Sequence, residues 1–380
     1  MLIGEAVSAL GRSRLVGIAG VFLAFCVVSF GQVTIHEFGG LSVADFPSSI
    51  CSGPDGALWF TEPPLAGQKV NAIGRITTRG AFTEYRLRVG AFVASPGGIT
   101  NGPDGALWFT EGGSNRIGRI DPTTHAVTEY GGLTGNANPS DIVSGPDGAL
   151  WFTEYNANRI GRIDPTTHTV TEYGGLTLNS QPLGIVSGPD GALWFTEYNA
   201  NRIGRITTTG VVAEYGGLTA SSGPFHIASG SDGALWFTEY GASRIGRIDP
   251  TAHTVTEYGG LTAGGAPYGI ASGPDGALWF TEHNANQIGR ITIGGVVAEY
   301  GGLKRGSGPL GIASGPDGAL WFTEENANQI GRVFLAPPLT PPPTPPLAVP
   351  TLSGWALATC GVLLASVAWS LLRGLRASAS

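Results

Sequence analysis

The chain has 380 residues, of which 61 are glycine and 26 are proline, whereas only 13% are charged and 42% are hydrophobic. This composition is typical of a turn-rich protein, and the apolar fraction excludes a disordered chain because a core can be built. The formal net charge of −7 excludes a basic surface for phosphate groups, so we expect no nucleic-acid partner.

The first segment of the chain, residues 1–31, has the pattern of a secretory signal peptide. Arg12 and Arg14 precede an apolar run over residues 15–30, and small residues stand near the expected cleavage site before Gln32. An uncleaved membrane anchor is the alternative, although the apolar run is short for a membrane span. Both interpretations place the rest of the chain outside the cytoplasm.

A repeat dominates the middle of the chain. The phrase LWFTE occurs seven times, and its tryptophans are Trp59, Trp108, Trp151, Trp194, Trp236, Trp279 and Trp321. A period in the low forties indicates either propeller blades or helical repeats. Within each unit, short runs of β-branched and aromatic residues alternate with Gly, Pro, Asn and Asp, which favours strands. The sequence therefore predicts an all-β, seven-bladed propeller of four-stranded antiparallel blades over residues 32–335.

The two ends of the repeat region predict how the ring closes. Six units finish on a strand that ends in Glu-Tyr, but the seventh unit runs into proline after Val333. An additional copy of that strand, residues 33–41, precedes the first LWFTE. Pairing this N-terminal strand with the last blade completes seven sheets and removes an exposed edge.

The chain ends in two further segments. Residues 336–350 are a proline-rich linker, which is typical of an extended spacer. In residues 351–380, an apolar stretch over residues 355–372 is just long enough for a transmembrane helix, and Arg373 and Arg376 place its end on the cytoplasmic side.

The start of that last segment resembles a bacterial sorting signal. Residues 349–355 read Val-Pro-Thr-Leu-Ser-Gly-Trp and precede the apolar helix and basic end, as in IPTL and PEP-CTERM tails, with Val in place of the usual first Ile. The resemblance implies processing by an exosortase-like membrane protease and delivery to the cell surface or the medium. A plain C-terminal membrane anchor is the alternative.

Each blade is expected to present two positions at one rim of the central channel. The first follows the proline that opens strand one, and the second is the glutamate that ends strand two: Glu62, Glu111, Glu154, Glu197, Glu239, Glu282 and Glu324. Seven carboxylates could form an acidic funnel for a divalent cation. Alternatively, each accepts hydrogen bonds from local backbone or pairs with the arginine of its own Ile-Gly-Arg segment, and we favour this structural role because the feature repeats in every blade.

Departures from the repeat point to blades six and seven. His283 follows the rim glutamate Glu282 and is expected in the same sector as Tyr268, Glu324 and Glu325. A histidine beside carboxylates is the minimum for general-base chemistry or a weak metal site. We therefore take His283, Tyr268 and Glu282 as candidate catalytic residues, and Glu324 and Glu325 as candidate metal ligands.

A second histidine also departs from the repeat. His226 replaces the glycine of the Pro-x-Gly-Ile segment that opens strand one of its blade. Because side chains alternate between the faces of a strand, we expect His226 to point away from its neighbour Phe225.

The sequence of the repeat resembles that of the virginiamycin B lyase, or streptogramin lyase, family. The segments Pro-Tyr268-Gly-Ile, Gly-Pro-Asp-Gly-Ala-Leu-Trp-Phe-Thr-Glu, Asn-Ala-Asn-Gln-Ile-Gly-Arg-Ile-Thr and Glu-Tyr carry the resemblance, which spans the whole predicted propeller. It implies a seven-bladed fold and a carbon–oxygen lyase that linearises cyclic depsipeptide antibiotics such as virginiamycin B. In that chemistry a histidine removes an α-proton while Mg²⁺ stabilises enolate-like charge.

The chain departs from the family at the positions that would carry this chemistry. The family histidines follow the opening proline of the last two blades, where this chain has Tyr268 and Leu310, and the family's acidic residue before the last of these prolines is Gly308 here. Leucine cannot abstract a proton. We therefore expect an exported, surface-directed binding or structural module with an unknown surface ligand. The alternative is a Mg²⁺-dependent lyase of cyclic depsipeptides that uses His283 as a substitute base and Glu324 or Glu325 on the metal.

Overall fold

In a computed structural model of the chain, the described residues are 33–335 except for 43–45, 65–70 and 88–94. The predicted signal peptide, proline-rich linker and sorting signal lie outside these residues and stay predictions. Within the described part, no helix has the length and apolar character that crossing a membrane requires. Gly31–Ala336 forms one compact unit.

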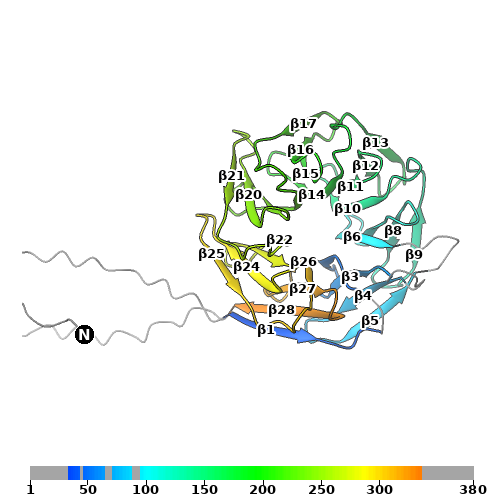
Figure 1. Cartoon of the computed structure of the whole chain (residues 1–380). Coiled ribbons are helices and arrows are strands. Elements are labelled where there is room, and N and C mark those ends of the chain that lie inside the picture. Colours follow the sequence, from blue (N-terminus) through cyan, green and yellow to red (C-terminus); the bar gives the residue numbers. More distant parts are fainter. Residues whose placement is uncertain (1–32, 43–45, 65–70, 88–94, 336–380) are drawn as a thin grey trace, which may run out of the picture. The chain divides into compact units, whose positions relative to one another are not determined.

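The described residues form seven antiparallel sheets of four strands each, arranged as blades around an axis (Figure 1). This confirms the predicted all-β, seven-bladed propeller. The innermost strands are β2 (Ile50–Ser52), β6 (Pro96–Asn101), β10 (Pro139–Ser144), β14 (Pro182–Ser187), β18 (Pro224–Ser229), β22 (Pro267–Ser272) and β26 (Pro309–Ser314). The second strands are the LWFTE segments β3 (Leu58–Glu62), β7 (Leu107–Glu111), β11 (Leu150–Glu154), β15 (Leu193–Glu197), β19 (Leu235–Glu239), β23 (Leu278–Glu282) and β27 (Leu320–Glu324).

The third strands carry the Ile-Gly-Arg segments and are β4 (Ala72–Ile76), β8 (Arg116–Ile120), β12 (Arg159–Ile163), β16 (Arg202–Ile206), β20 (Arg244–Ile248), β24 (Gln287–Ile291) and β28 (Gln329–Leu335). The outermost strands are β5 (Phe82–Arg86), β9 (Val127–Tyr130), β13 (Val170–Tyr173), β17 (Val212–Tyr215), β21 (Val255–Tyr258), β25 (Val297–Tyr300) and β1 (Val33–Phe38).

The N-terminal strand closes the ring, as the sequence predicts. β1 pairs antiparallel with β28, in a register that joins Val33 to Leu335 and Phe38 to Ile330. The seventh sheet therefore has the order β1-β28-β27-β26. The two ends of the propeller lie side by side in Figure 1, and separation of the blades requires this pairing to break.

A group of three side chains, repeated in every blade, explains why the Gly-Pro-Asp-Gly-Ala-Leu-Trp motif recurs. In the fourth blade the indole of Trp194 donates to Asp190 Oδ1 at 3.0 Å, and Arg205 pairs with Asp190 Oδ2 at 2.7 Å. The guanidinium of Arg205 also lies over the Trp194 ring, 5.8 Å from its centroid. The other six blades repeat this arrangement. The arginine of Ile-Gly-Arg therefore pairs with the turn aspartate and not with the glutamate of its blade.

Two rings of hydrogen bonds tie the blades together near the axis. The threonine of each LWFTE donates to a carbonyl of the next blade; Thr196, for example, donates to Phe225 O at 2.7 Å. The same contact occurs in every blade, and that of Thr323 with Ser48 O crosses the closure. A second ring joins Ser or Asn side chains at the ends of the innermost strands to the preceding blade.

Candidate functional site

The innermost strands surround a cavity of about 110 Å³. Its walls are residues that follow the opening proline of each blade, two from each of six blades and Gly311 from the seventh: Ser48, Ser49, Gly97, Gly98, Ser140, Asp141, Leu183, Gly184, Phe225, His226, Tyr268, Gly269 and Gly311. The cavity therefore lies at the first of the two predicted rim positions, the one that follows the opening proline, and not at the LWFTE glutamates.

Close packing of the blades explains why the second of these positions is mostly glycine. A Cβ atom on Gly269 would lie 2.4 Å from the carbonyl oxygen of Leu310 in the next blade, and one on Gly184 would lie 2.8 Å from the Cα of His226. Only Asp141 and His226 place a titratable side chain at this level of the cavity. Asp141 is accommodated beside Gly98, where a Cβ would come within 2.8 Å of the Asp141 Cα.

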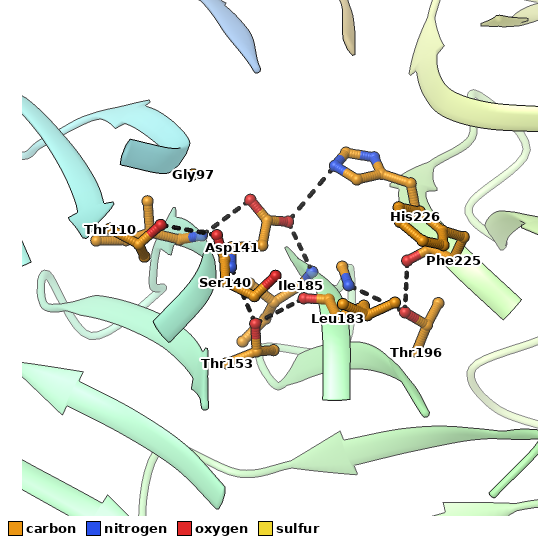
Figure 2. A network of polar contacts seen from close by, with 12 residues as sticks. Gly97, Thr110, Ser140, Asp141, Thr153, Leu183, Ile185, Thr196, Phe225 and His226 are labelled. Atoms are coloured by element: carbon orange, nitrogen blue, oxygen red, sulfur yellow. Dashed lines mark hydrogen bonds and ion pairs between the residues drawn. The ribbon is translucent and has the colours of Figure 1, made fainter. Parts of the chain in front are cut away.

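Asp141 and His226 both line the cavity, and their side chains turn toward each other, as Figure 2 shows. His226 Nε2 lies 3.5 Å from Asp141 Oδ2. The same Oδ2 accepts a hydrogen bond from the Ile185 amide at 3.0 Å, and Oδ1 accepts one from the Ile142 amide at 2.9 Å. Burial raises the pKa of Asp141, and these amides and His226 oppose the rise.

His226 and Phe225 both line the cavity but contact different neighbours: His226 faces Asp141, whereas Phe225 packs against Tyr268 and Tyr240. Asp141 is a candidate site residue that the sequence analysis did not predict. The feature that could have revealed it is the aspartate in place of the glycine of the repeated Pro-x-Gly-Ile segment.

Aromatic side chains gather on one side of the cavity. The ring centroids of Phe225 and Tyr268 are 4.2 Å apart, and Tyr240 lies 5.8 Å from Phe225 and 6.5 Å from Tyr268. Tyr198 meets Phe225 edge to face at 6.0 Å. We call Phe225, Tyr198, Tyr240 and Tyr268 the aromatic cluster. It offers a large apolar surface with phenol groups, which suits an organic ligand.

The candidate residues of blades six and seven come together only in part. His283 Nε2 lies 3.5 Å from a carboxylate oxygen of Glu325, and His283 Nδ1 contacts the Asn284 side chain at 3.1 Å. The contact with Glu325 raises the pKa of His283, which favours the protonated imidazole. Tyr268 lies at the cavity, where burial first, and then the charge of Glu325, raises the pKa of its phenol.

Glu282 and Glu324 lie inside their blades, where both are 0% exposed. Burial, together with the neighbouring glutamate of the outermost strand, raises the pKa of Glu282 to about 8. Glu324 is similar: its pKa is raised to about 7, chiefly by burial, beside Glu37. The other LWFTE glutamates share the buried position, so they form a buried ring of carboxyl groups and not an open acidic funnel.

These residues do not fit a Mg²⁺ ion. The metal requires several oxygen ligands in near-octahedral geometry. Glu324 is enclosed, and burial raises its pKa to about 7, whereas Glu325 faces His283. Across the residues that the structure describes, no three His, Cys, Asp or Glu side chains cluster closely enough to hold a metal ion. The described residues therefore do not provide a Mg²⁺ site.

The fold defines a seven-bladed propeller whose innermost strands surround one described cavity. The family model described as "Virginiamycin B lyase family" matches residues 27–216 and 165–345, and the chain belongs to this family. No curated protein matches the chain.

Solved structures agree with the family. The chain is 36% identical to a streptogramin B lyase, with a TM-score of 0.73, and the match covers 80% of this chain and 98% of that one. It is 37% identical to virginiamycin B lyase from Staphylococcus aureus, with a TM-score of 0.74 and coverage of 80% and 100%. A catalytically inactive His-to-Ala variant of that enzyme with quinupristin matches at 36% identity, a TM-score of 0.73 and the same coverage.

Proposed function

We propose that this chain is an exported binding module of the virginiamycin B lyase family, which holds an organic ligand at the aromatic cluster without cleaving it. One observation carries the proposal: the two positions that the resemblance assigns to catalytic histidines hold Tyr268 and Leu310. Tyr268 packs against Phe225, and Leu310 is 6% exposed. Neither side chain supplies a base at neutral pH, and Tyr268, which lines the cavity, can instead supply contact area to a ligand.

The ligand class follows from the cluster and from the relatives. Four aromatic rings beside a cavity favour a partly apolar molecule with ring systems of its own. A similar structure was solved with quinupristin. A cyclic depsipeptide is therefore the first ligand to test, and an unknown ligand at the cell surface is the broader class.

Export is the second part of the proposal and is supported by the sequence. The signal-peptide pattern of residues 1–31 and the IPTL-like segment at residues 349–355 are both features of exported chains. We infer that the propeller is delivered to the cell surface or the medium. The C-terminal helix anchors it in the membrane at least until an exosortase-like protease removes the tail.

A lyase of cyclic depsipeptides that depends on Mg²⁺ is the alternative function, and family membership supports it. It would require His283 to act as the base. The geometry does not favour this role, because His283 is not among the described residues that line the cavity, and its Nε2 faces Glu325 at 3.5 Å. The binding module is therefore the better supported function.

Calorimetric titration of quinupristin into the full chain tests the binding module. We expect saturable binding that Tyr240→Ala weakens about tenfold, which corresponds to about 1.4 kcal/mol. Tyr155→Ala is the matched control, because Tyr155 holds the equivalent position two blades away and is not a member of the aromatic cluster. Equal losses in both variants, or no binding by the wild-type chain, would contradict the proposal.

A further inference from the structure

We propose that the carboxylate of Asp141 receives an ammonium group of the ligand in the cavity, while the aromatic faces of Phe225 and Tyr268 attract the same charged group. This inference rests on the proposed function, because it assigns a chemical class to the ligand of the same cavity. Figure 2 shows the carboxylate of Asp141 turned toward His226.

The carboxylate is held in place but lacks a permanent cation. Backbone amides of Ile142 and Ile185 each donate to one of its oxygens, at 2.9 and 3.0 Å. His226 Nε2 is 3.5 Å away, which is too long for a strong hydrogen bond, and it is charged only if protonated. Among the described residues that line the cavity there is no lysine or arginine.

Burial makes this arrangement costly without a ligand. The Asp141 side chain is 16% exposed. A carboxylate removed from water is stabilised by a cation at contact distance and otherwise tends to take up a proton. The raised pKa of Asp141 agrees with an acid whose cation is missing. A ligand ammonium group would supply that charge.

The aromatic neighbours suit the same group. Phe225 and Tyr268 line the cavity that contains Asp141, and their ring centroids are 4.2 Å apart. Aromatic faces attract ammonium groups, most strongly where water is excluded. The size is also informative: a cavity of about 150 Å³ holds benzene, so the 110 Å³ here suits an ammonium on a short alkyl chain.

The experiment compares two probes of equal length, n-butylammonium and n-butanol, titrated into the full chain and followed by saturation-transfer NMR. We expect the wild-type chain to bind n-butylammonium at least tenfold more tightly than n-butanol. Asp141→Asn keeps the side-chain size and is expected to abolish this preference. Asp164→Asn, on the exposed outer turn of the same blade, is the matched control and should retain it. Equal binding of n-butylammonium by Asp141→Asn and wild type would overturn the inference.

A second variant keeps the test valid if Asp141→Asn folds poorly. Phe225→Leu retains apolar bulk but removes the ring, and we expect it to weaken n-butylammonium binding several-fold more than n-butanol binding. Equal weakening of the two probes would contradict the role of the ring. The quinupristin titration is independent. Binding of quinupristin without any preference for n-butylammonium would refute this inference alone. A preference for n-butylammonium without binding of quinupristin would refute quinupristin as the ligand.

Discussion

Glu197 and Glu214 lie close together inside the fourth blade, near enough for Glu214 to raise the pKa of Glu197. Glu197 ends the second strand and is 0% exposed, whereas Glu214, on the outermost strand, also accepts a hydrogen bond from Thr177 and pairs with Arg202 at 3.0 Å. Burial first, and then Glu214, raises the pKa of Glu197 to about 9, and the pKa of Glu214 is lowered. Glu197 is therefore the protonated partner at neutral pH.

We predict that the propeller loses stability as the pH rises from about 5 to about 9. The folded-state pKa of Glu197 lies above its ordinary value of 4.5, so its contribution is complete below pH 4.5 and is lost as the pH approaches 9. Glu154 and Glu239, with pKa values raised to about 8, add to the same trend. Chemical denaturation at a series of pH values measures the effect.

Glu197→Gln is the matched variant for that series. The amide keeps the size and the donor of the protonated acid but cannot ionise, so we expect a shallower loss of stability with pH. Each pKa unit that the substitution removes corresponds to about 1.4 kcal/mol. A variant whose pH profile equals that of the wild-type chain would show that Glu197 is not protonated in the fold.

The group of Asp190, Trp194 and Arg205 gives a second stability prediction. Asp190→Ala removes the partner of a fully buried indole and of a guanidinium, and we expect a loss of roughly 1–3 kcal/mol in the free energy of unfolding. Asp190→Asn keeps the acceptor for Trp194 and should cost less. Equal losses for the two variants, measured by urea denaturation, would assign the effect to the charge alone.

The ring of threonines predicts that blades are coupled through single hydroxyl groups. Thr196 donates to Phe225 O at 2.7 Å and accepts from the Gly184 amide at 3.0 Å. Thr196→Val keeps the shape but leaves both buried groups without a partner, which should cost roughly 1–3 kcal/mol. Thr209→Val, on an exposed turn, is the control and should change stability by less than about 0.5 kcal/mol. Hydrogen exchange at the Gly184 amide should accelerate in the first variant only.

His283 and Glu324 are predicted to behave differently when replaced by alanine. His283 is partly exposed at the rim, so His283→Ala should change the free energy of unfolding by less than about 0.5 kcal/mol. Glu324 is 0% exposed, and its loss leaves a cavity inside the blade, so Glu324→Ala should cost at least about 1 kcal/mol. Similar values for both would refute the buried placement of Glu324.

The sequence was sufficient to predict the fold because the same short pattern recurs with each blade. Repetition made the strands and the closing strand recognisable, and β1 pairs with β28 as expected. It did not reveal which polar groups meet. The pairing of Arg205 with Asp190 joins the third strand to the turn before the second, and the burial of Glu197 depends on all four strands of its blade. Asp141 and His226 come from blades three and five, so only the ring brings them together.

The most direct test of the central claim is mass spectrometry of a type B streptogramin after incubation with the full chain and Mg²⁺. We predict recovery of the intact cyclic antibiotic, because neither Tyr268 nor Leu310 supplies a base at neutral pH. Virginiamycin B lyase from Staphylococcus aureus serves as the positive control. A linearised product that is lost with EDTA and with His283→Ala would contradict the account and establish a lyase with a relocated base.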